Sequence, residues 1–121
     1  MKNTITLEHQ LTQIPITFCY TNKAYTKYIK KFHKLDNEYI EYGGVCIRLE
    51  RDNTGKSHIV IGVNKYDDIY VLKAMLVHEL SHCVTMLMEY SKINDDEYRS
   101  YTLQWLYLEI MPFLDSLLKA K

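Results

Sequence analysis

Hydrophobic and polar residues change their period several times along the 121-residue chain, and each change marks a new element. Residues 14–20 are β-branched and aromatic, which predicts a strand that starts after Pro15. In residues 21–35, apolar side chains recur every three or four positions, which predicts a helix capped by Thr21. The chain therefore begins with a strand followed by a helix.

A hairpin is expected next. Residues 45–51 alternate between apolar and polar side chains, residues 52–55 have a turn-forming composition, and residues 58–63 are almost continuously apolar. The continuous apolar run predicts that the second strand of the hairpin is the more buried one.

Two long helices complete the expected fold. The first is predicted at about residues 69–90, after a cap at Asp67 or Asp68. The second is predicted at about residues 94–118, and Pro112 is expected to kink or break it.

Composition agrees with one domain that covers residues 1–121. The order of elements makes it an α+β fold: a small antiparallel or mixed sheet with a leading helix, packed on two longer helices. The chain is 47% hydrophobic and 25% charged, which is ordinary for a globular protein and excludes a disordered chain. Lysine and arginine balance aspartate and glutamate at 15 each, which argues against a nucleic-acid-binding face.

The leading helix nevertheless carries many lysines. It has five, and most of these fall outside its apolar stripe: Lys23, Lys27, Lys30, Lys31 and Lys34. We interpret this basic face as a solvated helix surface, because a binding role needs a second basic element and the sequence indicates none.

Cysteine usage and the absence of targeting signals predict a cytoplasmic protein. Cys19, Cys46 and Cys83 are odd in number and have no CxxC spacing, so a disulfide framework is not expected. Polar residues interrupt the N-terminal region before a secretory signal can form. The most apolar stretch, taken as residues 103–118, is too short and too polar to cross a membrane.

The candidate chemistry lies in the first long helix, within the apolar segment 75–84. His78 and His82 are four positions apart, so they project from one helix face and can hold one metal ion. Glu79 can reach water at that metal without being a ligand, which is the HExxH arrangement. A metal would offset the several kcal/mol that unpartnered buried polar groups cost. The alternative is two histidines at the edge of the core and a surface glutamate.

A catalytic zinc usually has three protein ligands. The connection at residues 91–94 is short, so the next helix is expected to return alongside the first. We choose Glu97 as the third ligand, because Asp95 and Asp96 suit a cap and a first-turn acid. Glu89 lies on the same helix face as the histidines, but it is about 10 Å farther along the axis and cannot reach the same ion. The alternative is that Glu97 is a further first-turn acid.

This pattern resembles the gluzincin branch of the zincin metallopeptidases, especially the very small ones encoded by phages and mobile elements. The sequence HELSH follows a hairpin, and residues 96–101 (DEYRSY) match the DE-x-x-x-Y segment that opens the second helix in those proteins. The resemblance covers residues 57–105 and implies a minimal zincin-like domain.

The resemblance also implies a set of roles. One Zn²⁺ ion would be held by His78, His82 and Glu97, with Glu79 as the general base. Ser100 stands where larger gluzincins carry an acid that orients a histidine, so the interactions around the ligands are expected to differ.

Substrate contacts are expected at two further places. The oxyanion of the reaction needs a hydrogen-bond donor, and Tyr101, one turn after Glu97, is the first candidate. By analogy with zincins, residues 44–48 could be an edge strand that pairs with an extended peptide.

The expected function is a zinc metallopeptidase acting on a peptide or protein in the cytoplasm, with no nucleic-acid or membrane partner. One alternative is a non-catalytic zinc-binding or zincin-fold interaction module, such as a phage-encoded accessory or anti-defence protein. Another is a zinc hydrolase for an amide or ester in a small molecule. The sequence does not indicate an oligomeric state.

Overall fold

The computed structural model of the protein describes residues 2–50 and 56–120. Its elements, in order, are β1 (Thr4–Glu8), β2 (Pro15–Tyr20), α1 (Asn22–His33), β3 (Gly44–Glu50), β4 (Ser57–Val63), α2 (Ile69–Ser91) and α3 (Asp96–Lys119). The fold is α+β, as predicted, with a small mixed sheet and three helices in the described parts of the chain. The predicted turn at residues 52–55 lies outside the described residues.

The four strands form one sheet in the order β1-β2-β4-β3. The β1–β2 and β3–β4 pairs are antiparallel, whereas β2 and β4 are parallel, with Ile16 opposite Ile59. Strand β1 is not predicted from the sequence, because it has five residues and only Ile5 and Leu7 are apolar. Strand β3 lies at an edge of the sheet, so residues 44–48 belong to an edge strand, as predicted.

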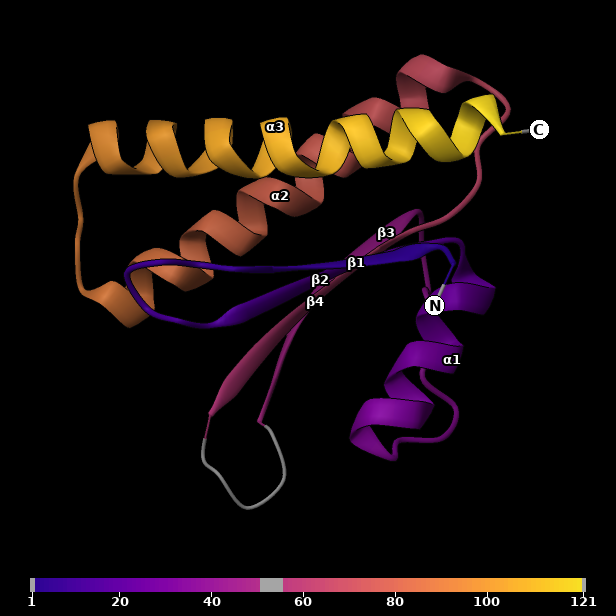
Figure 1. Ribbon diagram of the computed structural model, residues 1–121, viewed down its shortest axis with the longest axis horizontal. Helices are drawn as coiled ribbons and strands as arrows, with labels where there is room; N and C mark the ends of the chain where they lie inside the picture. Colours follow the sequence, from indigo (N-terminus) through magenta and orange to yellow (C-terminus); the bar gives the residue numbers. More distant parts are fainter. Residues whose placement is uncertain (1, 51–55, 121) are drawn as a thin grey trace.

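The central strands β2 and β4 are buried on both faces. Phe18 and Ile61 belong to the core shared with α2 and α3, whereas Cys19 and Val60 belong to a smaller core shared with α1. The sheet accordingly lies between α1 on one side and the α2–α3 pair on the other (Figure 1). All seven residues of β4 are buried, which confirms that the second hairpin strand is the more buried one.

Side chains cap each helix at its start. Thr21, Asp68 and Asp95 precede α1, α2 and α3, and each accepts a hydrogen bond from a backbone N–H of the first turn. Helix α3 continues through Pro112 rather than breaking there. Because proline has no backbone N–H, the carbonyl of Leu108, four residues earlier, lacks its helical hydrogen-bond donor. Leu108 is exposed, so water can donate to this carbonyl instead.

Helix α2 is central to the core. Among the described helices, α2 alone is long and apolar enough to cross a membrane, by length and composition. The prediction that residues 103–118 form the most apolar stretch is therefore wrong. Of its apolar window, 44% is buried inside the fold. Leu76, Leu80 and Leu87 are fully buried between the sheet and α3. This packing determines which residues of α2 are left for the opposite face.

Candidate functional site

Helix α2 exposes the two histidines of the HExxH motif and buries its glutamate. His78 and His82 are exposed, whereas Glu79 is only 5% exposed. The histidine Nε2 atoms lie 3.3 Å apart, with the ring planes at 80° to each other. The predicted pair is therefore brought together, and the alternative of Glu79 as a surface carboxylate is wrong.

The spacing between these two Nε2 atoms suits a shared zinc ion. Zinc binds histidine nitrogen at about 2.0–2.1 Å, and a tetrahedral angle then separates two such nitrogens by about 3.3–3.4 Å. The observed 3.3 Å agrees with that value. The same distance accommodates a hydrogen bond between one protonated and one bare Nε2. The separation of the two nitrogens is thus compatible with two positions of one zinc site.

Glu79 is held against the start of strand β3. A Cβ atom on Gly44 would lie 2.9 Å from both Cγ and Oε2 of Glu79, so the carboxylate reaches this position only because residue 44 has no side chain. Burial raises the pKa of Glu79, and the neighbouring His78 and His82 lower it by a smaller amount. The motif thus combines two exposed nitrogen ligands with a partly desolvated carboxyl group.

The motif lines a cavity of about 360 Å³ between helix α2 and the edge strand β3. Its wall opposite the helix is the segment around Tyr42 and Gly44. Two hydrogen bonds fix that segment: Asn64 donates its backbone N–H to the carbonyl of Gly43 and its side-chain amide to the carbonyl of Tyr42. The lining comprises Tyr42, Gly43, Gly44, Cys46, Met75, His78, Glu79, His82 and Met86.

One side of this cavity is rich in sulfur. The Cys46 thiol lies 3.9 Å from the thioether of Met86. A hydrogen bond with Cys83, together with burial, strongly raises the pKa of Cys46, so this thiol stays protonated. Cys83 is fully buried, as expected of a small core residue. These groups give the cavity an apolar wall beside the histidine pair.

Glu97 and Tyr101 lie apart from this cavity. Both are exposed, and neither contributes to its lining. Arg99 of α3 donates a hydrogen bond to Thr85 of α2, and residues two positions away on a helix are rotated by about 200°. Glu97 and Tyr101 are each two positions from Arg99, so they face away from α2. Within residues 2–50 and 56–120, no three His, Cys, Asp or Glu side chains gather to hold a metal ion.

The other histidines have structural environments. His58 is 1% exposed, its Nε2 lies 2.8 Å from the Thr17 hydroxyl, and its Nδ1 lies 2.8 Å from Nε2 of His33. His58 is therefore a hydrogen-bonded histidine within strand β4. His9 accepts a hydrogen bond from the backbone N–H of Thr12 at Nδ1, which leaves its Nε2–H to donate to the Tyr98 hydroxyl.

Sequence reasoning missed the residues that complete the cavity. Tyr42, Met75 and Met86 have no pattern that separates them from ordinary surface or core residues. The Gly43–Gly44 pair did offer a signal, because consecutive glycines at the start of a strand indicate a close approach of another group. The approaching groups are the side chains of Tyr66 and Met75 at Gly43, and those of Glu79 and Met75 at Gly44.

Comparison of the chain with protein-family models, with curated proteins and with solved structures found no match.

Proposed function

We propose that the protein is a zinc-dependent metallopeptidase of minimal gluzincin type. The observation that carries this proposal is the 3.3 Å separation of the His78 and His82 Nε2 atoms beside the buried Glu79. When bound, zinc acts as a Lewis acid that polarises a carbonyl and lowers the pKa of water. The two histidines would hold the ion at the mouth of the cavity, where a substrate can reach it from solvent.

Glu79 would serve as the general base. Its raised pKa brings the carboxyl group closer to the pH at which it can both accept and release a proton. It would take a proton from the attacking water and return it to the nitrogen of the leaving amine. The close contact with Gly44 fixes the carboxylate, so little reorganisation is needed when the proton moves.

Strand β3 would align the substrate. An edge strand keeps backbone N–H and C=O groups that no neighbouring strand uses, and an extended peptide can pair with them. The strand begins at Gly44, beside Glu79, so a peptide paired with it would pass the catalytic carboxylate. The thioether of Met86 and the thiol of Cys46 would offer an apolar surface to one of its side chains.

The proposal also includes a third protein ligand. Glu97 is the candidate from the sequence, and reaching the histidines would require the first turns of α3 to rotate. Glu97→Gln should lower zinc affinity at least about tenfold if Glu97 is a ligand, whereas Asp96→Asn, its exposed neighbour, should not. Equal affinities for both variants and the parent chain would leave a site with two histidine ligands.

The second candidate function is a non-catalytic module that keeps the metal site or only the fold. The observation in its favour is that two metal-ligating side chains, rather than three, converge among the described residues. Such a module could bind a partner through the same cavity without hydrolysing it.

Metal content and a conservative base variant test the proposal. Protein purified without added metal should hold about one equivalent of zinc, and a chelator should lower its stability. Glu79→Gln should keep the zinc and lower peptide cleavage by about 10²–10⁴-fold, measured by mass spectrometry on a peptide library. Glu89→Gln, an exposed glutamate on the same helix, is the matched control.

Two results would contradict the metallopeptidase. Less than about a tenth of an equivalent of zinc, with no effect of the chelator, would remove the metal site. If Glu79→Gln retains both its zinc and every measurable effect of the parent chain, the non-catalytic module is the correct function.

A further inference from the structure

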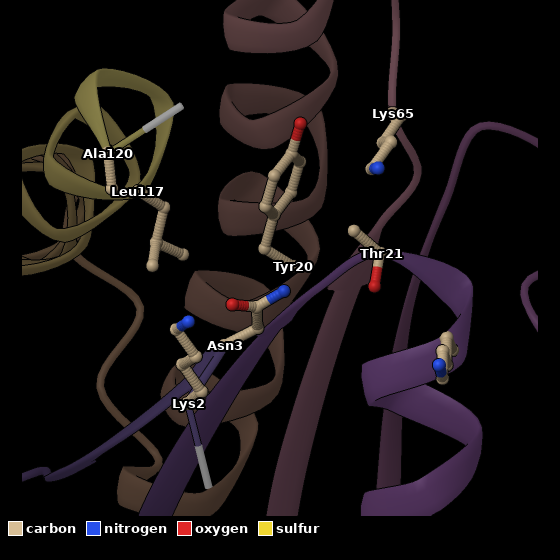
Figure 2. Close-up of a pocket in the computed structure, with 8 residues that line it drawn as sticks. Lys2, Asn3, Tyr20, Thr21, Lys65, Leu117 and Ala120 are labelled. Carbon is tan, nitrogen blue, oxygen red and sulfur yellow. The ribbon is translucent and has the colours of Figure 1, made fainter.

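A second cavity lies at the end of the sheet where strands β2 and β4 finish. It has a volume of about 370 Å³ and lies between the start of α1 and the end of α3. Figure 2 shows Lys2 and Lys65 approaching it from different sides, with Tyr20 between them. Lys23 lines it as well, and an adjoining hollow of about 270 Å³ adds Lys27. We refer to these two connected hollows as the lysine crevice.

The lysine crevice has an excess of positive charge. No aspartate or glutamate lines either hollow. Within residues 2–50 and 56–120 the ion pairs of lysine are Lys30–Asp36 and Lys73–Asp115, so the four crevice lysines have no carboxylate partner there. Several like charges around one concavity attract an anion. The second basic element that the sequence did not indicate is thus supplied by Lys2 and Lys65, which folding brings beside α1.

The topology of the sheet creates this crevice. Strands β2 and β4 are parallel neighbours, and the helices that follow them pack on opposite faces of the sheet. In sheets with parallel strands, this divergence opens a crevice at the carboxyl ends of the strands, where ligands bind. Helix α1 begins there, directly after Thr21, and has no acidic residue in its first turn. Its unpaired N–H groups and its dipole favour a negative charge at this place.

Tyr20 provides an independent indication of a ligand. The residue is only 3% exposed, and the tyrosine hydroxyls that form side-chain hydrogen bonds among residues 2–50 and 56–120 are those of Tyr28, Tyr90 and Tyr98, not that of Tyr20. No fully buried side-chain oxygen in that part of the chain lacks a partner, so this hydroxyl must open onto the cavity. Figure 2 shows it pointing into the space between Leu117 and Lys65. Burial raises the pKa of Tyr20, which keeps the hydroxyl as a donor.

From these observations we infer that the lysine crevice is a binding site for the phosphate groups of a small phosphorylated molecule. Four lysines, a tyrosine hydroxyl and the N-terminus of α1 offer more donors and charge than a single carboxylate can use, and they match a group with several anionic oxygens. The cavity volume suits a di- or triphosphate. The site goes beyond the proposed peptidase function and does not depend on it.

The test is a titration of the full chain with inorganic pyrophosphate in about 0.15 M salt. Binding is monitored by the NMR chemical shifts of the backbone amides. Saturable shifts should appear at residues 20–24 and at Lys65. The double variant Lys23→Gln/Lys65→Gln should weaken binding at least about tenfold, and Tyr20→Phe, which removes one hydroxyl, about fivefold. The matched control is Lys30→Gln/Lys31→Gln, which removes the same charge at the other end of α1.

The same titration on His82→Ala separates the crevice from the metal site, because phosphate attracted to a metal at the histidines would lose its binding in that variant. Unchanged affinity there supports the inference. An equal loss in the Lys30/Lys31 control, or no saturable shift at residues 20–24, would overturn it. A single-stranded oligonucleotide that displaces pyrophosphate and binds more than about tenfold tighter would overturn the assignment to a small molecule.

Discussion

Two pairs of neighbouring histidines occur in this protein, and they differ in the elements that bring their rings together. His78 and His82 lie on one exposed helix face with their Nε2 atoms 3.3 Å apart. His33 and His58 come from a helix and a strand 25 positions apart, and their ring nitrogens lie at 2.8 Å. The shorter distance is that of a direct hydrogen bond, whereas the longer one accommodates either a hydrogen bond or two ligands of one tetrahedral ion.

The difference shows that neighbouring histidines do not by themselves indicate a metal. The His33–His58 pair is part of a network that includes the hydroxyls of Thr17 and Tyr28, so its nitrogens already have protein partners. The His78–His82 pair has solvent in front of it and a buried carboxyl group beside it. The first pair links α1 to the sheet, whereas the second faces solvent and is the pair proposed to bind zinc.

The largest effect expected is on metal affinity. His78→Ala should lower zinc affinity at least about 100-fold, because His78 is a ligand in the proposed site and removing a ligand costs more than removing a group that merely orients one. His33→Ala should leave the affinity within about twofold of the parent chain. Competition with a fluorescent zinc chelator measures both. Equal losses in the two variants would mean that both pairs affect zinc through folding alone.

For the free energy of unfolding, we expect the larger loss at the His33–His58 pair and the smaller loss at the His78–His82 pair. His58→Ala should lower the free energy of unfolding by about 2–4 kcal/mol, because it leaves a cavity and removes a partner of the Thr17 hydroxyl. His82→Ala, measured with a chelator present, should change it by less than about 0.5 kcal/mol. Urea denaturation followed by circular dichroism provides the comparison. A loss at His82 as large as that at His58 would contradict the proposed division of roles.

Gly44→Ala should have an intermediate effect. The added methyl group would clash with Glu79 and Met75, and such overpacking costs about 1–3 kcal/mol. Because the clash displaces the carboxylate, peptide cleavage should fall even at temperatures where the variant is folded. Val45→Ala, at the next position in the same strand, is the control for a change in β3. Full activity in Gly44→Ala would show that the contact with Glu79 is unimportant.

The smallest effect expected is a pH dependence at His9. Burial lowers the pKa of His9 below its ordinary 6.5, so the unfolded chain binds a proton more readily than the folded one. Its contribution to stability is complete above pH 6.5 and declines as the pH falls below that value. His9→Gln should flatten the stability profile on the acid side of pH 6.5. Parallel profiles for parent and variant would assign the acid sensitivity to other groups.

Features set by neighbours in the sequence could be predicted. Thr21, Asp68 and Asp95 cap their helices because a short polar side chain reaches the backbone two or three residues later. The approach of His78 and His82 follows from helix geometry in the same way. These contacts need no knowledge of the tertiary fold.

Features that depend on how elements pack could not be predicted. The parallel pairing of β2 and β4 joins segments that the hairpin pattern does not connect, and it is what gathers Lys2, Lys23 and Lys65. The direction in which Glu97 faces depends on the rotation of α3, which its buried residues Leu106 and Ile110 determine. Charge and spacing along the chain carry no record of that rotation.

The parallel strand pair also has a consequence for the order of folding. Ile16 and Ile59 are 43 positions apart, so joining β2 to β4 closes a long loop, whereas the histidine pair needs only one helical turn. We expect the two histidines to approach each other as soon as α2 forms, and the lysine crevice to exist only after the sheet is complete. A nascent chain would then be able to capture a metal ion well before it could recognise a phosphate.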